Sequence, residues 1–319
     1  MIQKLAIIFT ALIALSACSG EPSASPNDAV LSPAESTTST VPRTVPPTAC
    51  SVGEWADTGL LAINASWDGD YELFVFDLAS KEVERLTDND VVDRWPKWSP
   101  DGREILFFSD RDGDYEVFVM DYNTRVVKQL TDNDAMDGFA SWSPDGTRIA
   151  FGSARDGDWE IFVAKAGGTD PQQLTFNEVD DHTPVWSPEG DRLAFNSYRD
   201  GGYAMWMMNA DGSAQEIIQL GTSAGFPVWA TSGEKIAFNT AAKGNRAVGI
   251  VDLAASGSAE PYLQVFAFAG GWPVWSSDGD RLAFSSAMCG GEKEIFLVDS
   301  DGTGLTATGV IGEAISWRN

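Results

Sequence analysis

Residues 98–131 read WSPDGREILFFSDRDGDYEVFVMDYNTRVVKQLT, and this stretch decides the fold because the chain repeats it. Its opening phrase, WSPDG, returns intact or altered at Trp142, Trp186, Trp229, Trp275 and Trp317. The six tryptophans are spaced 44, 44, 43, 46 and 42 residues apart. A fixed period of this length is typical of stacked supersecondary units, so each repeat is expected to be one such unit.

Each repeat contains four candidate strands. In residues 98–131, the runs 104–109 and 116–121 are apolar and of strand length, and a polar turn, 110–114, separates them. A shorter run covers 126–130, and the residues before the next tryptophan make the fourth strand. Four strands per period, joined by Asp-Gly and Pro-Asp-Gly turns, are typical of a β-propeller blade. The predicted fold class is therefore all-β, a six-bladed β-propeller.

The phase of the repeat predicts how the ring closes. The first blade begins at Gly59 with its second strand, LLAINAS, and has no tryptophan strand of its own. Residues 313–317, EAISW, form a tryptophan strand with no further repeat behind it. We expect this C-terminal strand to join blade 1, because closure removes the exposed sheet edges of an open array.

The composition divides the chain into three segments. Residues 1–17 carry one basic residue, Lys4, followed by the apolar run 5–15, which predicts a secretory signal peptide. Residues 18–49 are rich in Ser, Thr, Pro and Ala and predict an extended, solvated tether. Residues 50–319 are the predicted propeller domain.

The sequence Leu15-Ser16-Ala17-Cys18 resembles the lipobox of bacterial lipoproteins. The resemblance implies cleavage before Cys18, diacylglyceryl modification of its sulfur, and anchoring to the cell membrane or outer membrane, facing the periplasm or the exterior. The alternative is an ordinary signal peptide with a coincidental cysteine. If Cys18 carries lipid, Cys50 and Cys289 remain, and ring closure brings their blades together. We expect a disulfide between them, with free buried thiols as the alternative.

The formal net charge of −26 limits the partners. A field of this sign repels phosphate backbones, so nucleic acid is not an expected partner, whereas cations or a basic protein patch would be attracted. Solubility alone would also explain the charge. With one histidine, the chain lacks the ligands that zinc, copper and non-haem iron sites use. We expect no cofactor, with calcium as the one exception.

With these residues in view, the repeats resemble those of TolB-like β-propellers. The resemblance covers residues 59–317 and rests on Leu130-Thr131, Trp142–Gly146, Ile149–Phe151, Ser153–Gly157 and Glu160–Val163. It implies either a periplasmic or surface protein-binding module or the lid of a prolyl-oligopeptidase-type peptidase. No α/β-hydrolase domain follows the repeats, so the peptidase interpretation lacks its catalytic half.

Acidic and aromatic residues recur near the expected channel mouth. The loops between blades share a face with the loops joining second and third strands, and both are acidic in blades 1 to 4 but not in blades 5 and 6. Such acids beside exposed aromatics could bind a cationic ligand, a basic peptide or a sugar. The alternative is that the acids cap turns and the aromatics pack between blades. The candidate ligand-binding residues are Asp93, Trp95, Asp137, Phe139, Asp181, His182, Phe226 and Trp272. For His182, the simpler expectation is a solvated loop residue without a function.

Other patterns are weaker. Residues 110–121 lack the sixth-position glycine and twelfth-position glutamate of an EF-hand, and their arginine, which recurs in later repeats, predicts a salt bridge that orders the turn. An irregular calcium site remains open, with Asp88, Asp90, Asp132 and Asp134 as candidate ligands. Residues 221–225 match G-x-S-x-G, but they form a loop between two strands rather than a nucleophile elbow. We assign no catalytic residue.

The predicted function is a non-catalytic binding or scaffolding module of the cell envelope, with protein as the expected ligand. The alternative is a carbohydrate- or peptide-processing enzyme, similar to a glycoside hydrolase or lyase, that uses acids at the channel mouth. Two acids facing each other across the channel, one with a raised pKa and beside an aromatic-lined pocket, would favour the enzyme.

Overall fold

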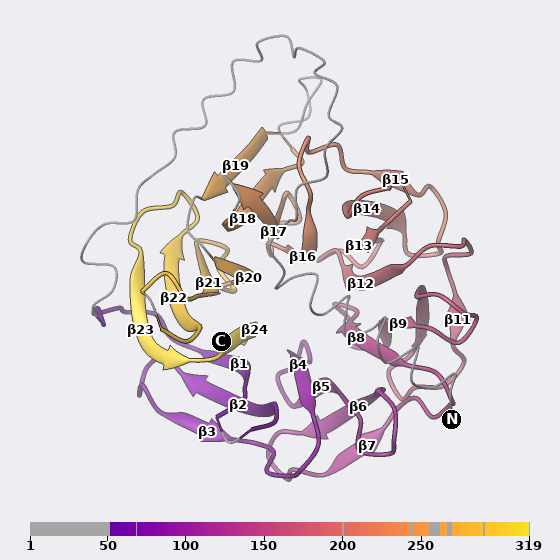
Figure 1. Cartoon of the computed structure of the whole chain (residues 1–319), viewed down its shortest axis with the longest axis horizontal. Coiled ribbons are helices and arrows are strands. Elements are labelled where there is room, and N and C mark those ends of the chain that lie inside the picture. Colours follow the sequence, from indigo (N-terminus) through magenta and orange to yellow (C-terminus); the bar gives the residue numbers. More distant parts are fainter. Residues whose placement is uncertain are drawn as a thin grey trace, which may run out of the picture. The chain divides into compact units, whose positions relative to one another are not determined.

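Six four-stranded antiparallel sheets surround a central channel in the computed structural model (Figure 1). The structure describes residues 52–67, 69–199, 201–242, 245–254, 262–266, 270–289 and 291–318, all within one compact unit. These residues contain 24 strands and no helix, and therefore no helix that could cross a membrane. The predicted six-bladed β-propeller is confirmed. The expected signal peptide, tether, Cys18 and Cys50 lie outside the described residues.

The strands follow the order predicted for a propeller, with the first strand of each sheet innermost. Blade 1 consists of β24 (Glu313–Arg318), β1 (Leu60–Ala65), β2 (Glu72–Asp77) and β3 (Val83–Arg85). Blade 2 consists of β4 (Asp93–Trp98), β5 (Glu104–Ser109), β6 (Glu116–Asp121) and β7 (Val127–Gln129). Blade 3 consists of β8 (Asp137–Trp142), β9 (Arg148–Ser153), β10 (Glu160–Lys165) and β11 (Gln172–Gln173).

The remaining blades repeat the same order. Blade 4 consists of β12 (Asp181–Trp186), β13 (Arg192–Ser197), β14 (Ala204–Asn209) and β15 (Glu216–Ile217). Blade 5 consists of β16 (Gly225–Trp229), β17 (Lys235–Ala242), β18 (Asn245–Asp252) and β19 (Tyr262–Phe266). Blade 6 consists of β20 (Gly270–Trp275), β21 (Arg281–Ser286), β22 (Glu294–Asp299) and β23 (Thr306–Ile311).

The ring closes as the repeat phase predicts. Strand β24 pairs antiparallel with β1, so that Leu60 lies opposite Arg318 and Asn64 lies opposite Glu313. Figure 1 shows β24 beside β1 at the inner side of blade 1. The strand missing from blade 1 is thus supplied by residues more than 240 positions later in the chain.

The hydrophobic core lies between neighbouring blades. One cluster, for example, joins Ile250 and Phe266 of blade 5 to Trp275 and Phe284 of blade 6. The second strands of blades 2 to 6 each place a phenylalanine, at most 2% exposed, at the same position: Phe107, Phe151, Phe195, Phe238 and Phe284. Because both faces of each sheet are covered in this way, the middle strands are apolar in nearly continuous runs.

A β-bulge interrupts the inner strand of blades 2 to 6. In blade 2, the pairing shifts between Arg94 and Lys97, so that Trp95 is the extra residue, with a φ of 59°. The equivalent residues have φ between 54° and 55°: Phe139, Thr183, Phe226 and Trp272. A positive φ is uncommon for bulky residues, so the conformation requires support from the surrounding structure.

Asparagine side chains of the preceding blade supply part of this support. The backbone N–H of Phe226 donates to Asn196 Oδ1 at 2.8 Å, and that of Trp272 donates to Asn239 Oδ1 at 2.6 Å.

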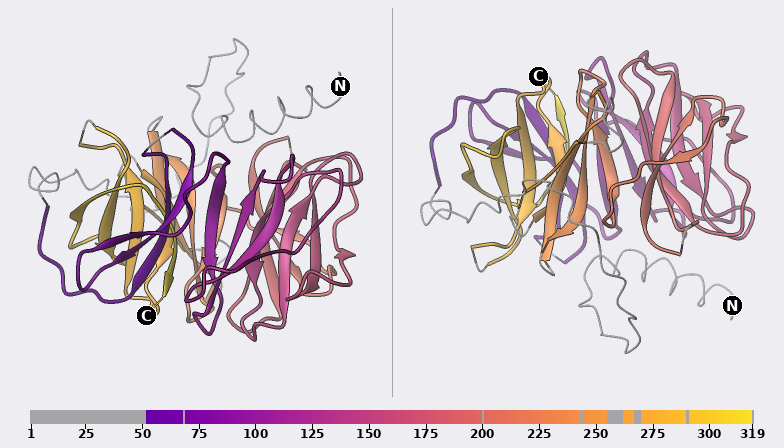
Figure 2. Two further views of the ribbon diagram at one scale, coloured as in Figure 1. Left: turned by 90° about the horizontal axis from the view of Figure 1, so that it is seen from below. Right: turned by 90° about the horizontal axis from the view of Figure 1, so that it is seen from above.

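The side views in Figure 2 show loops at both faces of the ring. We call the opening where the inner strands begin the upper mouth, and the opening where they end, at the repeat tryptophans, the lower mouth.

Candidate functional site

The predicted ligand-binding aspartates are buried in a repeated polar network. Asp93, Asp137 and Asp181 are all 0% exposed. Each accepts a hydrogen bond at 2.8 Å from the side chain of an asparagine four residues earlier, Asn89, Asn133 or Asn177. Each also pairs with an arginine eighteen residues later, Arg111, Arg155 or Arg199. The carboxylates are therefore occupied by the scaffold and do not face the upper mouth.

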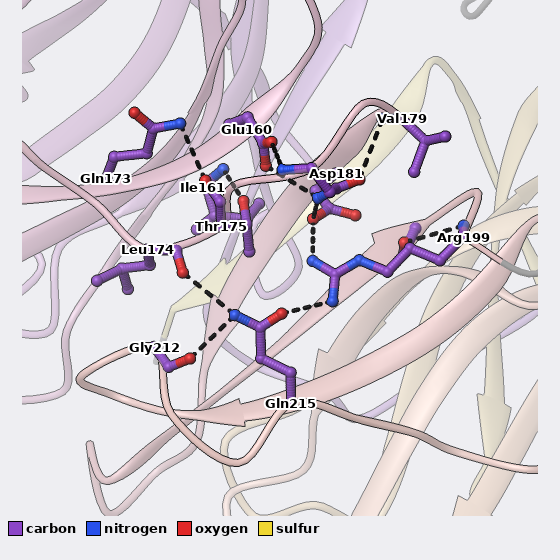
Figure 3. Close-up of polar contacts among 12 residues, drawn as sticks. Glu160, Ile161, Gln173, Leu174, Thr175, Val179, Asp181, Arg199, Gly212 and Gln215 are labelled. Atoms are coloured by element: carbon purple, nitrogen blue, oxygen red, sulfur yellow. Dashed lines mark hydrogen bonds and ion pairs between the residues drawn. The ribbon is translucent and has the colours of Figure 1, made fainter.

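A buried glutamate of the preceding blade completes each network. The backbone N–H of Asn177 donates to Glu160 Oε1 at 2.6 Å, while its side chain donates to Asp181. Figure 3 shows Glu160, Asp181 and Arg199 of this network. Glu72 and Glu116 bond Asn89 and Asn133 in the same way. Burial raises the pKa of Glu116 to about 8 and that of Glu160 to about 7. The Glu–Asn–Asp–Arg network thus ties one blade to the next. The salt bridge predicted for the recurring arginine is present, with the inter-blade aspartate as its partner.

A different polar cluster lies at the seam between blades 6, 1 and 2. Glu313, which is 3% exposed, accepts hydrogen bonds from Lys293 Nζ at 2.6 Å, Asn64 Nδ2 at 3.0 Å and Arg94 Nη2 at 3.2 Å. Burial favours the neutral acid, but the charges of Arg94 and Lys293 outweigh burial and hold the pKa of Glu313 below its ordinary value. Sequence reasoning missed these residues, because their repeat positions hold other residue types in the remaining blades.

The four predicted aromatic residues meet across the channel as an aromatic plug, formed by Trp95, Phe139, Phe226 and Trp272. The rings of Trp95 and Phe226 stack with centroids 5.1 Å apart and planes 4° apart. They come from blades 2 and 5, which lie on opposite sides of the ring, so the stack crosses the channel axis. Phe139 lies 5.6 Å from Trp95, and Trp272 lies 6.5 Å from Phe226. The side chains therefore pack across the channel rather than between blades.

Cations gather over one edge of this plug. Lys293 Nζ lies 4.1 Å from the ring centroid of Trp272, and the guanidinium of Arg246 lies 5.0 Å from it. Both distances suit a cation–π interaction. The upper mouth is therefore cationic beside Trp272.

His182 is buried, and the expectation of a solvated loop residue is wrong. The side chain is 6% exposed, because aromatic residues of blades 3 and 4 cover it. Its ring centroid lies 5.6 Å from those of Phe139 and Tyr203 and 6.5 Å from that of Tyr198. Burial lowers the pKa of His182 to about 4, against the opposing charge of Asp181. The imidazole is therefore neutral at pH 7 and lies against the plug.

Two cavities occupy the channel below the plug. The upper one is small and lies against Pro184, Pro227 and Pro273. The lower one opens at the lower mouth, has a volume of about 470 Å³ and is lined by the six repeat tryptophans. Among the described residues that line these cavities, Lys97 is the one charged side chain, and none is a carboxylate. No pair of acids faces across either cavity.

The predicted calcium ligands, Asp88, Asp90, Asp132 and Asp134, are exposed on two different inter-blade loops. Asp88 pairs with Arg85 at 3.0 Å. Within the described part of the chain, three ligand atoms lie within 4.8 Å of one another at Asp156, Asp158 and Glu160 instead. Glu160 already accepts the Asn177 N–H, so this member of the cluster is part of the Glu–Asn–Asp–Arg network.

Phe176 is a further exposed residue on the upper face. It is 74% exposed in the loop between blades 3 and 4, at the repeat position where the two preceding loops carry Asp88 and Asp132. Trp67, in the loop between β1 and β2, is 49% exposed. Large apolar side chains thus stand among acids on this face.

Comparisons with known proteins agree on the fold. The family model described as TolB beta propeller domain matches residues 50–138 and 111–256. A curated relative, Protein TolB homolog of Chlorobium chlorochromatii (strain CaD3), is 40% identical over 57 residues, which are 18% of this chain and 13% of that protein. The match thus spans a small part of the relative's length.

Three solved structures illustrate the structural likeness. TolB from Acinetobacter baumannii superposes with a TM-score of 0.71 at 18% identity, over 82% of this chain and 66% of that one. The putative TolB from Agrobacterium tumefaciens gives 0.63 at 18% identity, over 82% and 94%. An oligogalacturonate lyase in complex with manganese gives 0.57 at 16% identity, over 77% and 72%. At these identities, the likeness concerns the fold alone.

Proposed function

Because the chain belongs to the TolB β-propeller family, we propose that its upper face is a non-catalytic binding surface for a protein partner in the cell envelope. The observation that carries the proposal is Phe176, an aromatic residue 74% exposed where the equivalent loops carry aspartate. Aromatic residues that become buried on association dominate the energy of many interfaces. Phe176 would be such an anchor.

The surroundings of Phe176 define the chemistry of the partner. Exposed acids stand on the inter-blade loops at Asp88, Asp90, Asp132, Asp134 and Glu178. Complementary charge steers association and selects the partner. We therefore expect a segment that combines basic side chains with an apolar anchor.

The enzymatic alternative has less support. It requires acids that face one another across the channel, whereas the described residues lining both channel cavities include no carboxylate. The glutamates with raised pKa values, Glu116 and Glu160, are bonded within the Glu–Asn–Asp–Arg network.

Affinity capture of the full chain from its own cell envelope tests the proposal. We expect Phe176→Asp, which installs the residue of the equivalent loops, to reduce recovery of the partner at least about tenfold, the equivalent of 1.4 kcal/mol. Asp132→Lys/Asp134→Lys should also reduce it, and high salt should weaken the wild-type interaction. The matched control is Val126→Asp, because Val126 is 65% exposed on the opposite face. Equal recovery by all variants would refute the proposal.

We also propose that the protein is exported and lipid-anchored. Residues 1–17 would be removed, Cys18 would carry the lipid, and residues 18–49 would tether the propeller. Mass spectrometry of the mature protein should find a diacylglyceryl group on residue 18, and Cys18→Ser should release the protein from membranes. An unmodified Cys18 in the mature protein would contradict the anchor.

The expected bridge between Cys50 and Cys289 belongs to the same proposal, because an exported protein meets an oxidising compartment. Peptide mapping without reduction should recover the two cysteines in one cross-linked species. A bridge of this kind stabilises by about 2–4 kcal/mol, so reductant should lower the melting temperature. Alkylation of both thiols without reduction would contradict the bridge.

A further inference from the structure

Lys97 is an unusual residue for its position in the repeat. It stands one residue before Trp98 on the inner strand β4 and lines both channel cavities. The other inner strands carry small or apolar residues there: Ser141, Val185, Val228, Val274 and Ser316. A lysine here places one positive charge in a channel whose described lining is otherwise uncharged.

The ammonium group of Lys97 has spare hydrogen-bonding capacity. Nζ donates to the carbonyl oxygen of Ile315 at 2.8 Å. An ammonium carries three N–H donors, and that carbonyl accepts one of them. Burial lowers the pKa of Lys97 to about 8, so the group is still mostly protonated at pH 7. A partly buried cation with no anionic partner among the described residues is costly, and an anion in the cavity would offset that cost.

The tryptophans around Lys97 supply the apolar part of the lining. Trp98, Trp186 and Trp229 are among the six that line the cavity of about 470 Å³ at the lower mouth. Their indole N–H groups are enclosed by the protein and do not reach the cavity. Lys97 is therefore the lining group that can pair with an anion, and the indoles can pack against an apolar body.

The nearby acids do not compete for this position. The aspartates of the WSPDG-type turns are bound within their own turns: Ser99 donates to Asp101 at 2.7 Å, and Ser143 donates to Asp145 at 2.6 Å. None of these carboxylates is among the described residues that line the cavity. The volume lies in the range of small-ligand sites, and indole faces suit a flat apolar group.

We propose that the lower mouth binds a carboxylate carried on an apolar body, with Lys97 holding the carboxylate and the repeat tryptophans packing against the body. The carboxylate could belong to a free organic acid or to the C-terminus of a peptide, and both present the same chemistry. This site is separate from the upper face, so it does not depend on the proposed partner.

Calorimetric titration of the full-length protein tests the proposal with two probes. One is indole-3-acetate, a free acid, and the other is the peptide acetyl-Gly-Gly-Trp with a free C-terminal carboxylate. Binding of the first alone assigns a small acid, and binding of the second alone assigns a chain terminus. The same peptide with a C-terminal amide should bind at least about tenfold more weakly, because a hydrogen-bonded charge is lost. Failure of both acids to bind at millimolar concentration would overturn the proposal.

Substitution assigns the binding to Lys97. Lys97→Met should weaken binding of the acids at least about tenfold and leave the amide unchanged, whereas Lys128→Met, at an exposed position on β7, should change neither.

A measurement on the wild-type protein covers the case in which Lys97→Met does not fold. Because no other described residue lining either cavity titrates near pH 8, binding should fall as the pH rises through about 8. Unchanged binding in Lys97→Met, or from pH 7 to 9.5, would overturn the assignment.

Discussion

Arg155→Met should destabilise the propeller strongly, although Arg155 stands in a surface turn. Arg155 Nη2 lies 2.8 Å from Asp137 Oδ2, and the aspartate side chain is fully buried. Methionine keeps the aliphatic stem but removes the charge. Asp137 then keeps its hydrogen bond from Asn133 but loses its counter-ion.

The expected loss of stability follows from how deeply each side chain of the pair is buried. Unit charges about 4 Å apart attract by about 4 kcal/mol at an effective dielectric constant of 20. Removing one partner of a fully buried pair costs about 3–5 kcal/mol. Because the Arg155 side chain is 29% exposed, water screens part of the interaction, and we expect a loss of about 2–3 kcal/mol. The pair of Arg103 and Asp101 is 78% and 61% exposed, so Arg103→Met should cost less than about 1 kcal/mol.

Urea denaturation measures both values as shifts of the midpoint at constant m-value. A double-mutant cycle with Asp137→Asn isolates the pair, because the double variant no longer buries an unpaired carboxylate and should recover part of the stability. If Arg155→Met cost no more than Arg103→Met, the pairing of Arg155 with the buried Asp137 would not stabilise blade 3 as we describe. A zero coupling energy in the cycle would refute the reasoning equally.

Three further predictions concern stability. Gly168→Ala should cost about 2 kcal/mol or more, because Gly168 has a φ of 83° and an added Cβ would lie 2.1 Å from the Leu130 carbonyl oxygen. Gly202→Ala is the control, because the space around Gly202 is open, and it should cost under about 0.5 kcal/mol in the same urea titration. Since burial raises the pKa of Glu160 to about 7, the stabilising contribution of Glu160 is complete below about pH 4.5 and is lost as the pH rises through 7. Glu160→Gln should therefore remove a decline in the free energy of unfolding of up to about 1.4 kcal/mol per pH unit. Glu189→Gln, at an exposed site, should leave that decline in place. Since the pKa of His182 is lowered to about 4, wild-type stability should also fall between pH 6.5 and 4, and His182→Phe should abolish that fall in thermal melts; an identical acid limb in both proteins would contradict its burial.

The architecture was predictable because it depends on periodicity. A tryptophan phrase repeated every 42 to 46 residues fixes the number of blades, and the phase difference between residues 59 and 313 fixes how the ring closes. Neither inference requires knowledge of where any single side chain points.

The candidate site was less predictable, because side-chain direction depends on register. The bulge at Trp95 adds one residue to the inner strand, and a shift of one residue reverses the facing of every later side chain. Nothing in a Trp-Pro-Lys sequence indicates a left-handed backbone at the tryptophan. Loop acids such as Asp88 and Asp93 look alike in sequence, yet the first is exposed and the second is buried.

Comparison of the repeats nevertheless held usable signals. Asp93, Asp137 and Asp181 each have an asparagine four residues before and an arginine eighteen residues after, and this joint spacing marks a scaffold rather than a ligand site. Lys97 was visible as the one basic residue among serines and valines at its repeat position. The sequence does not show that this position lines the channel, so a role for Lys97 could be inferred only from the structure.

The pairing of β24 with β1 has a consequence for how the protein is made. A ribosome completes β1 long before it reaches β24, and the inner edge of β1 stays without its neighbour during that interval. Contacts between residues so distant in sequence form slowly, because a long loop must close before they gain any stability. Among the six blades, blade 1 is therefore the first whose strands begin to be translated and the last to be completed, and the inner edge of β1 stays open to other pairings until β24 arrives.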